Sequence, residues 1–363
     1  MQVTNLVPLS DHFQIFEDKS QLVDKIAKIT KIVRDGLSLP KGASLDQVQP
    51  NLFLYREKEF RCFSVAEEKQ SSIDFEQLKK FIAEELIIEK PKVLQIIGSS
   101  EPFSEKGTQF SKEFLSKKLA DRSTIVLYGF TAHRKDNKRC VNGIVNDWVD
   151  ENPQERSMRT IANIVNFHTR QALDLWNCDA SLHVRIHYLV FGKGDSKENG
   201  GATFGKDVES SDRLTDEAIC FEGGIQSLRQ AINILGENNP VTFVDGLREN
   251  KFLNVSEGVF LENSLKMREK LAFSRRDELL KLSNNQVPMV SCSTFFLYLN
   301  ENKENLDETK AAQLWDDFFS VYFPGSPAKK DFFTKEQLLK DAKEDFFKKK
   351  IWEKLPLCTF YIF

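Results

Sequence analysis

Short, nearly continuous apolar runs that end at or beside a glycine alternate with helical patterns, and this alternation constrains the fold more than any other feature. The runs are KVLQIIG (92–98), STIVLYG (123–129), VRIHYLVFG (184–192), EAICFEGG (217–224) and PVTFVDG (240–246). Such runs are typical of strands that are covered on both faces. Helical patterns at 104–120, 141–176 and 225–235 separate them. The alternation predicts an α/β fold with a doubly wound, mostly parallel, Rossmann-like sheet.

The flanking segments have a different texture, and 363 residues are enough for more than one domain. Residues 1–90 combine helical and strand-like patterns and predict an N-terminal α/β elaboration. Residues 91–300 would form the Rossmann-like domain and end in a strand-like run at 290–300. Residues 301–363 predict a helical C-terminal region. Its last nine residues, LPLCTFYIF, are expected to be docked, because exposing them would favour aggregation.

Composition excludes several functional classes. The net charge of −3 offers no basic excess for a nucleic-acid backbone. No apolar run reaches the ~18 residues that span a bilayer. The N-terminus shows no cleaved signal pattern, and the six cysteines are scattered through mostly apolar contexts, which favours reduced thiols and a cytoplasmic location. Secretion by a route without a cleaved signal stays open.

The glycines at the strand ends predict a ligand site. Ligands of open parallel sheets bind beyond the carboxyl ends of the strands, and Gly98, Gly129 and Gly223–Gly224 all stand at such ends. Where a helix follows at once, its free N–H groups and positive dipole end favour an anion. The predicted anion cradle consists of the amides around Ser99, Ser100, Gly223, Gly224, Ile225 and Gln226, with the Ser227 hydroxyl. This pattern predicts a phosphate- or carboxylate-bearing small molecule, with neither metal nor cofactor.

The order of these motifs resembles the SLOG superfamily, the Rossmann-like group that contains the LOG, or lysine decarboxylase-like, phosphoribohydrolases. The resemblance covers residues 92–255. It rests on the first strand with GSS, on KEFLSKKLADRSTIVLYGF, on TDEAICFEGGIQSLRQ and on NPVTFVDGLREN. The resemblance implies a nucleotide-type ligand, chemistry at an N-glycosidic bond and, since such relatives often pair, a homodimer.

The chain departs from that family at its catalytic motif. Glu222 stands where the family has Pro, Gln226 and Ser227 stand where it has Gly-Thr, and Gln230 occupies the position of the catalytic glutamate. An amide cannot exchange a proton near neutral pH as a carboxylate does. The family's basic pair is also missing, although Arg213 lies near its expected position.

Two functional hypotheses follow from these departures. In the first, the protein is an enzyme in which Glu222 or Asp245 replaces the missing glutamate. In the second, it is a non-catalytic nucleotide sensor or a protein-interaction module, for example a secreted effector. His133 and the basic residues of 134–139 could form a flap over the ligand or an ordinary solvated loop. His183 and His187 are four residues apart, but no Cys or carboxylate partner lies near them in the sequence.

Overall fold

The computed structural model describes residues 14–16, 52–56, 61–65, 75–99, 102–120, 123–129, 140–151, 160–165, 187–191, 212–248, 252–254, 286–288, 291–322 and 335–363. The chain forms two compact units built from interleaved stretches. The first contains 1–94, 116–135 and 145–215, and the second contains 95–115, 136–144 and 216–363. These boundaries differ from the predicted division at 90 and 300, because strands that are distant in the sequence pair with one another inside each unit.

The sheet of the first unit joins strands from three separate stretches. Its strands are β1 (Gln14–Phe16), β2 (Leu52–Arg56), β3 (Arg61–Val65), β5 (Thr124–Gly129), β6 (Thr160–Val165) and β7 (His187–Phe191), in the order β1-β2-β3-β7-β6-β5. Only β2 and β3 pair in antiparallel fashion, and the other neighbours are parallel. Helix α3 (Phe75–Glu85) agrees with the mixed helical and strand-like texture of residues 1–90.

The predicted helix over 141–176 was wrong in part. Helix α5 spans only Val141–Asp150, and Thr160–Val165 forms β6, between β5 and β7. The segment TIANIV contains four β-branched residues, and such residues fit a pleated strand better than a helix once neighbouring strands are available on both sides. A helical pattern of apolar residues also occurs over 20–36, but this segment lies outside the described residues.

The second unit contains the predicted parallel α/β arrangement. Its strands follow the order β4-β8-β9-β12, where β4 is Lys92–Gly98, β8 is Glu217–Phe221, β9 is Val241–Asp245 and β12 is Cys358–Ile362. Strands β8, β9 and β12 run parallel. The helices are α4 (Glu105–Lys118), α9 (Ile225–Gly236), α12 (Cys292–Glu301), α13 (Glu308–Tyr322) and α14 (Lys335–Lys348), with a 3-10 helix η5 (Ile351–Leu357). A separate two-stranded sheet pairs β10 (Phe252–Asn254) with β11 (Gln286–Pro288).

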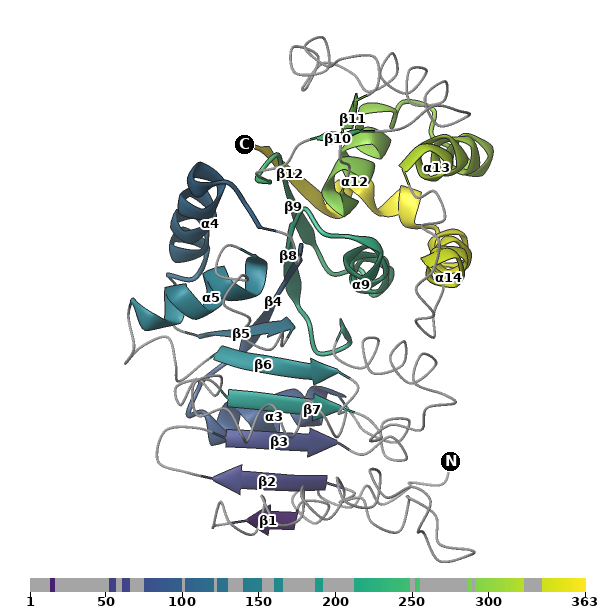
Figure 1. Ribbon diagram of the computed structural model, residues 1–363. Coiled ribbons are helices and arrows are strands. Elements are labelled where there is room, and N and C mark those ends of the chain that lie inside the picture. Colours follow the sequence, from purple (N-terminus) through teal and green to yellow (C-terminus); the bar gives the residue numbers. More distant parts are fainter. Residues whose placement is uncertain are drawn as a thin grey trace, which may run out of the picture. The chain divides into compact units, whose positions relative to one another are not determined.

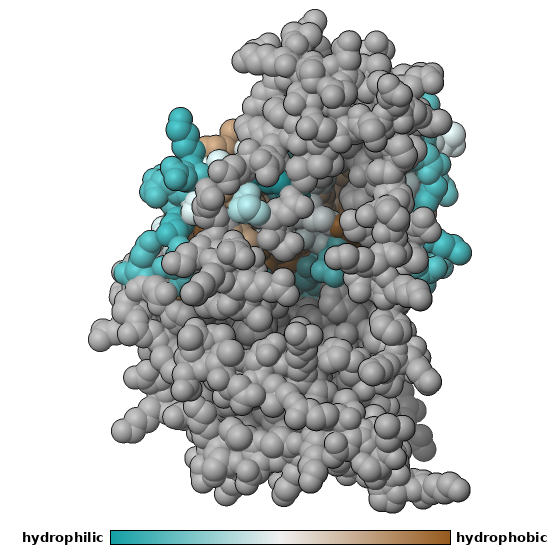
Figure 2. Space-filling model, viewed as in Figure 1, coloured by the Kyte–Doolittle hydropathy of each residue, from teal (hydrophilic) through white to brown (hydrophobic). Residues whose placement is uncertain are grey.

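Helices cover both faces of this sheet, which confirms the doubly wound class. Figure 1 shows α4 on one side of β8 and β9 and α9 and α12 on the other. The ring of Phe114 in α4 lies 6.0 Å from that of Phe221 in β8. On the opposite face, Phe296 of α12 stacks on Phe243 of β9 at 4.4 Å. Figure 2 shows hydrophilic residues over the outer sides of α4 and of the α13–α14 pair, as expected for helices with one face on a core.

The segment 290–300 was expected as a strand, but Cys292–Glu301 forms helix α12. Ser291 caps the helix: its hydroxyl accepts the N–H of Thr294, and the Thr294 hydroxyl accepts the N–H of Ser291. These two hydrogen bonds and the packing of aromatic side chains of α12 on β9 stabilise the helix. The prediction that LPLCTFYIF is docked is confirmed for its backbone, since β12 pairs with β9 from Cys358↔Val241 to Ile362↔Asp245, but the last three side chains are exposed. Among the described residues, no helix is long and apolar enough to cross a bilayer.

Candidate functional site

The turn after β8 has an unusual backbone. Glu222 and Gly223 both have positive φ, at 60° and 81°. Few residues other than glycine adopt this conformation readily. A Cβ atom on Gly223 would also lie 2.4 Å from the Cβ of Ser227. The chain therefore reverses sharply between β8 and α9, and glycine is required at the centre of the turn.

Helix α9 begins directly after this turn with an open N-terminus. Its N-cap residue is Gly224, which has an extended backbone with φ of −103° and ψ of −155°. No side-chain hydrogen bond caps the helix at this residue. Gly224 is exposed, and a Cβ built there would meet no atom within 4 Å among the described residues. The first N–H groups of a helix, here those of Ile225, Gln226 and Ser227, have no acceptor inside it. Their partial positive charge favours an anion.

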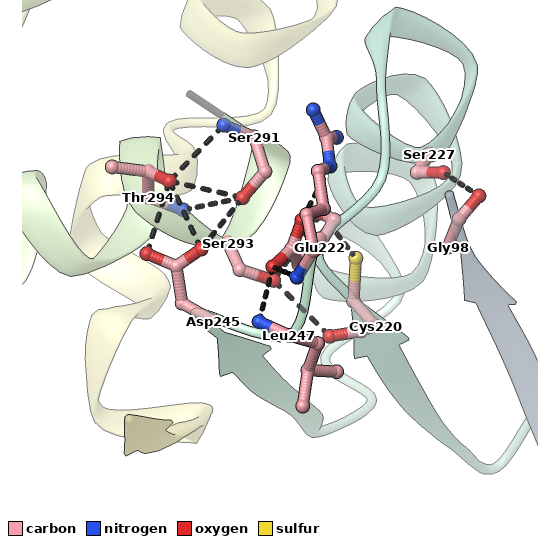
Figure 3. Close-up of polar contacts among 10 residues, drawn as sticks. Gly98, Cys220, Glu222, Ser227, Asp245, Leu247, Ser291, Ser293 and Thr294 are labelled. Atoms are coloured by element: carbon pink, nitrogen blue, oxygen red, sulfur yellow. Dashed lines mark hydrogen bonds and ion pairs between the residues drawn. The ribbon is translucent and has the colours of Figure 1, made fainter. Parts of the chain in front are cut away.

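Gly98, at the end of β4, lies next to this turn. The Ser227 hydroxyl donates to the carbonyl of Gly98 at 3.1 Å, as Figure 3 shows, and the N–H of Ser99 donates to the carbonyl of Phe221 at 3.0 Å. A Cβ on Gly98 would lie 2.5 Å from that same Phe221 oxygen. The structure thus brings the two predicted glycine turns together, but it uses the Ser227 hydroxyl and the Ser99 amide to join them.

Glu222 ties the turn after β8 to the loop after β9. Its side chain is 3% exposed. Its Oε1 accepts the N–H of Leu247 at 2.5 Å and that of Arg248 at 3.0 Å, and its Oε2 pairs with the Arg248 guanidinium. The Glu222 carbonyl accepts the N–H of Ser293 at 3.0 Å, so the same residue also anchors the start of α12. Glu222 therefore links the turn after β8, the loop after β9 and the start of α12.

Asp245 has a similar position at the end of β9. Its buried carboxylate accepts the Ser291 hydroxyl at 3.1 Å and the Thr294 hydroxyl at 3.1 and 3.0 Å. Figure 3 shows these contacts beside the capping bonds of Ser291 and Thr294. The carboxylate therefore binds the N-terminal turn of α12, which holds that helix against the strand. Hydrogen-bond donors converge on both candidate catalytic carboxylates from inside the fold.

Comparisons with known proteins add no family to this geometry. No protein-family model matches the chain, and no curated protein sequence matches it. What the site does must therefore be inferred from its residues.

The remaining predicted site residues are spread over the chain. Gly129 ends β5 and Arg213 is an exposed residue whose guanidinium lies 4.3 Å from the centroid of the Phe75 ring; both belong to the first unit. Gln230 is half-buried on α9, more than a turn beyond the open N-terminus. Ser100, His133, His183 and residues 134–139 lie outside the described residues, and of His187 only the backbone, in β7, is described.

Sequence reasoning missed the partners of the two carboxylates. Arg248 follows β9 by three residues, and only the tertiary pairing with Glu222 shows its role. Ser291 and Thr294 carried a usable signal, because a Ser followed three residues later by a residue with a polar side chain resembles the start of a helix. This helix-start signal was missed because the apolar residues that follow were interpreted as a strand.

The buried cysteines of the second unit are poor nucleophiles. Burial raises the pKa of the Cys292 thiol well above its usual value, and hydrogen bonding with Cys220 raises it further. Burial also raises the pKa of Cys358 to about 12. Since the thiolate is the reactive form, these thiols stay inert near neutral pH. Within the described ranges, no group of three or more His, Cys, Asp or Glu side chains could hold a metal ion.

Proposed function

We propose that the second unit binds the phosphate group of a nucleotide-type small molecule at the N-terminus of α9. The observation that carries the proposal is the open, exposed cap at Gly224, at the carboxyl end of a parallel strand. Phosphate groups bind at such helix termini through main-chain N–H groups, here those of Ile225, Gln226 and Ser227. The resemblance of residues 92–255 to the SLOG superfamily supports a nucleotide as the molecule that carries the phosphate.

Binding without turnover fits the two carboxylates better than catalysis does. A general base needs an oxygen within reach of the substrate. The oxygens of Glu222 accept bonds from Leu247 and Arg248, and those of Asp245 accept bonds from the hydroxyls at the start of α12. Removing either carboxylate from these contacts would leave buried donors without an acceptor. The proposed role is therefore that of a nucleotide sensor or ligand-gated interaction module.

The substitution Gly224→Asp tests the site sharply. An aspartate at the N-cap supplies its own acceptor to the first-turn N–H groups and places a negative charge where the phosphate would bind. The extended backbone of Gly224 and the open space around it accommodate the side chain. We expect this variant to fold with equal or higher thermal stability and to lose ligand binding. Gly224→Ala is the matched control, because it keeps the amides open and adds no charge.

Binding is measured by thermal shift and calorimetry with AMP, ADP-ribose, NAD and inorganic phosphate, each at millimolar concentration. Released base is followed by chromatography in the same samples. Stabilisation of the wild-type protein and of Gly224→Ala, with neither stabilisation of Gly224→Asp nor released base, supports the proposal. Equal binding by Gly224→Asp, or no shift of the wild-type protein with any ligand, would refute it. Released base would assign an enzyme instead.

A further inference from the structure

Strand β12 is the last strand in the order β4-β8-β9-β12, so one of its edges has no neighbour among the described strands. The N–H of Phe363 donates to the carbonyl of Asp245 at 2.9 Å, on the β9 side. Because successive residues of a strand direct their backbone groups to opposite sides, Thr359 and Tyr361 share that direction. Phe360 and Ile362 therefore direct their N–H and C=O groups away from β9, toward the outer edge.

This edge is apolar and carries no charged side chain. Of the four exposed large hydrophobic residues in the described part of the chain, three are consecutive here: Tyr361 at 40%, Ile362 at 48% and Phe363 at 42%. The fourth is Ile87 in the first unit. No charged residue occurs between Lys354 and Phe363. Natural edge strands are protected by charged side chains, prolines or bulges, and the five residues of β12 contain no charged side chain and no proline.

We propose that β12 pairs with β12 of a second copy of this chain, in antiparallel fashion, so that the two sheets of the second units become continuous. A two-fold axis brings the residues nearest to it close to their own copies, so a charged side chain there would face a like charge. The absence of charge on β12 suits this arrangement. The exposed side chains also match, because each strand offers the other the same apolar residues across the junction.

The backbone directions restrict the register to those in which outward-facing residues pair with each other, and the proposed register places Tyr361 at the two-fold axis. Phe360 pairs with Ile362 of the second copy and Ile362 with Phe360, and each pair exchanges two N–H to C=O hydrogen bonds. The two-fold axis then passes beside Tyr361, which faces its own copy as a non-hydrogen-bonded pair with Cα atoms about 4.5 Å apart. That separation suits a disulfide between cysteines placed at this position. Thr359 faces Phe363 of the second copy and lies far from its own equivalent.

Light scattering after size-exclusion chromatography tests the assembly over a wide range of protein concentrations. We expect the wild-type chain to have twice its 41.8 kDa mass. Ile362→Lys, which places a charge on the edge, should halve the measured mass. Ile87→Lys is the matched control, because it exchanges another exposed isoleucine, outside the proposed interface, and should leave the dimer intact. A monomeric wild-type chain at every concentration, or a dimer that Ile362→Lys leaves unchanged, would overturn the proposal.

Cross-linking tests the register even if Ile362→Lys fails to fold. Under mild oxidation, Tyr361→Cys should give a covalent dimer on a non-reducing gel, and Thr359→Cys should give no more than the wild-type background. Equal cross-linking by the two variants, or none by Tyr361→Cys, contradicts the proposed pairing. Both variants are made in the full chain, and circular dichroism confirms that each is folded.

Discussion

Glu222 and Arg248 form an ion pair between the ends of the neighbouring strands β8 and β9. Oε2 of Glu222 contacts Nε of Arg248, and the two side chains are 3% and 10% exposed. The pair stands beside a strained backbone, since Glu222 has a φ of 60°. Two main-chain N–H groups also donate hydrogen bonds to Oε1 of Glu222. This carboxylate therefore holds the loops at the carboxyl ends of β8 and β9 in one conformation.

We therefore expect Glu222→Gln to destabilise the second unit. The glutamine would present an N–H group to the guanidinium and leave the buried charge of Arg248 without its counter-ion, which costs about 3 kcal/mol. Denaturant unfolding followed by fluorescence measures the loss. Glu237→Gln, at the exposed C-cap of α9, should change the free energy of unfolding by less than about 0.5 kcal/mol. A stable Glu222→Gln protein that has lost an activity would instead assign Glu222 to catalysis.

Two glycines that look alike in the sequence should respond differently to alanine. At Gly98 the new Cβ would lie 2.5 Å from a backbone oxygen of Phe221, and a backbone atom cannot move aside cheaply. Gly98→Ala should lower the free energy of unfolding by about 2 kcal/mol or more. At Gly129 a Cβ would meet no described atom within 4 Å, so Gly129→Ala should cost less than about 0.5 kcal/mol. Thermal unfolding of the two variants side by side checks this, and equal losses would contradict the close approach of β4 and β8.

Stability should decrease at alkaline pH. Burial raises the pKa of the Cys358 thiol to about 12, whereas an unfolded cysteine ionises near pH ~8.5. The folded protein thus keeps a proton that the unfolded chain loses, so the stabilisation is full below about pH 8.5 and is lost as the pH rises toward 12. Burial also raises the pKa of Tyr298 to about 12 and acts in the same direction.

Unfolding free energies measured from neutral to alkaline pH test this linkage. Cys358→Ala should have a shallower alkaline decline than the wild-type protein, by at most about 1.4 kcal/mol per pH unit. Thr359→Ala, which changes the exposed neighbouring residue and no ionisable group, should keep the wild-type slope. If Cys358→Ala and the wild-type protein decline alike, the thiol is not protected from ionisation in the folded state.

Much of the fold could be predicted because its signals are local. The apolar runs that became β4, β5, β8 and β9 and the helical pattern of α9 are each contained within a short segment. The glycine turn at 223–224 was also visible as two adjacent glycines, and the positive φ of Gly223 explains the first of them. By contrast, 160–165 and 290–300 were assigned wrongly, because apolar periodicity in short segments fits a strand and a helix about equally well.

By itself, the sequence determined an α/β chain with parallel strands and a glycine turn where β8 leads into α9, and anion binding at that turn is a prediction. Only the tertiary structure decided what the polar residues around that turn do. Glu222 meets Arg248, Asp245 meets Ser291 and Thr294, and Ser227 meets Gly98 across gaps of 26, 46, 49 and 129 residues. The physical reason is one of range: backbone conformation and hydrophobic periodicity act between near neighbours, whereas a buried polar group takes whichever partner the folded chain brings to it.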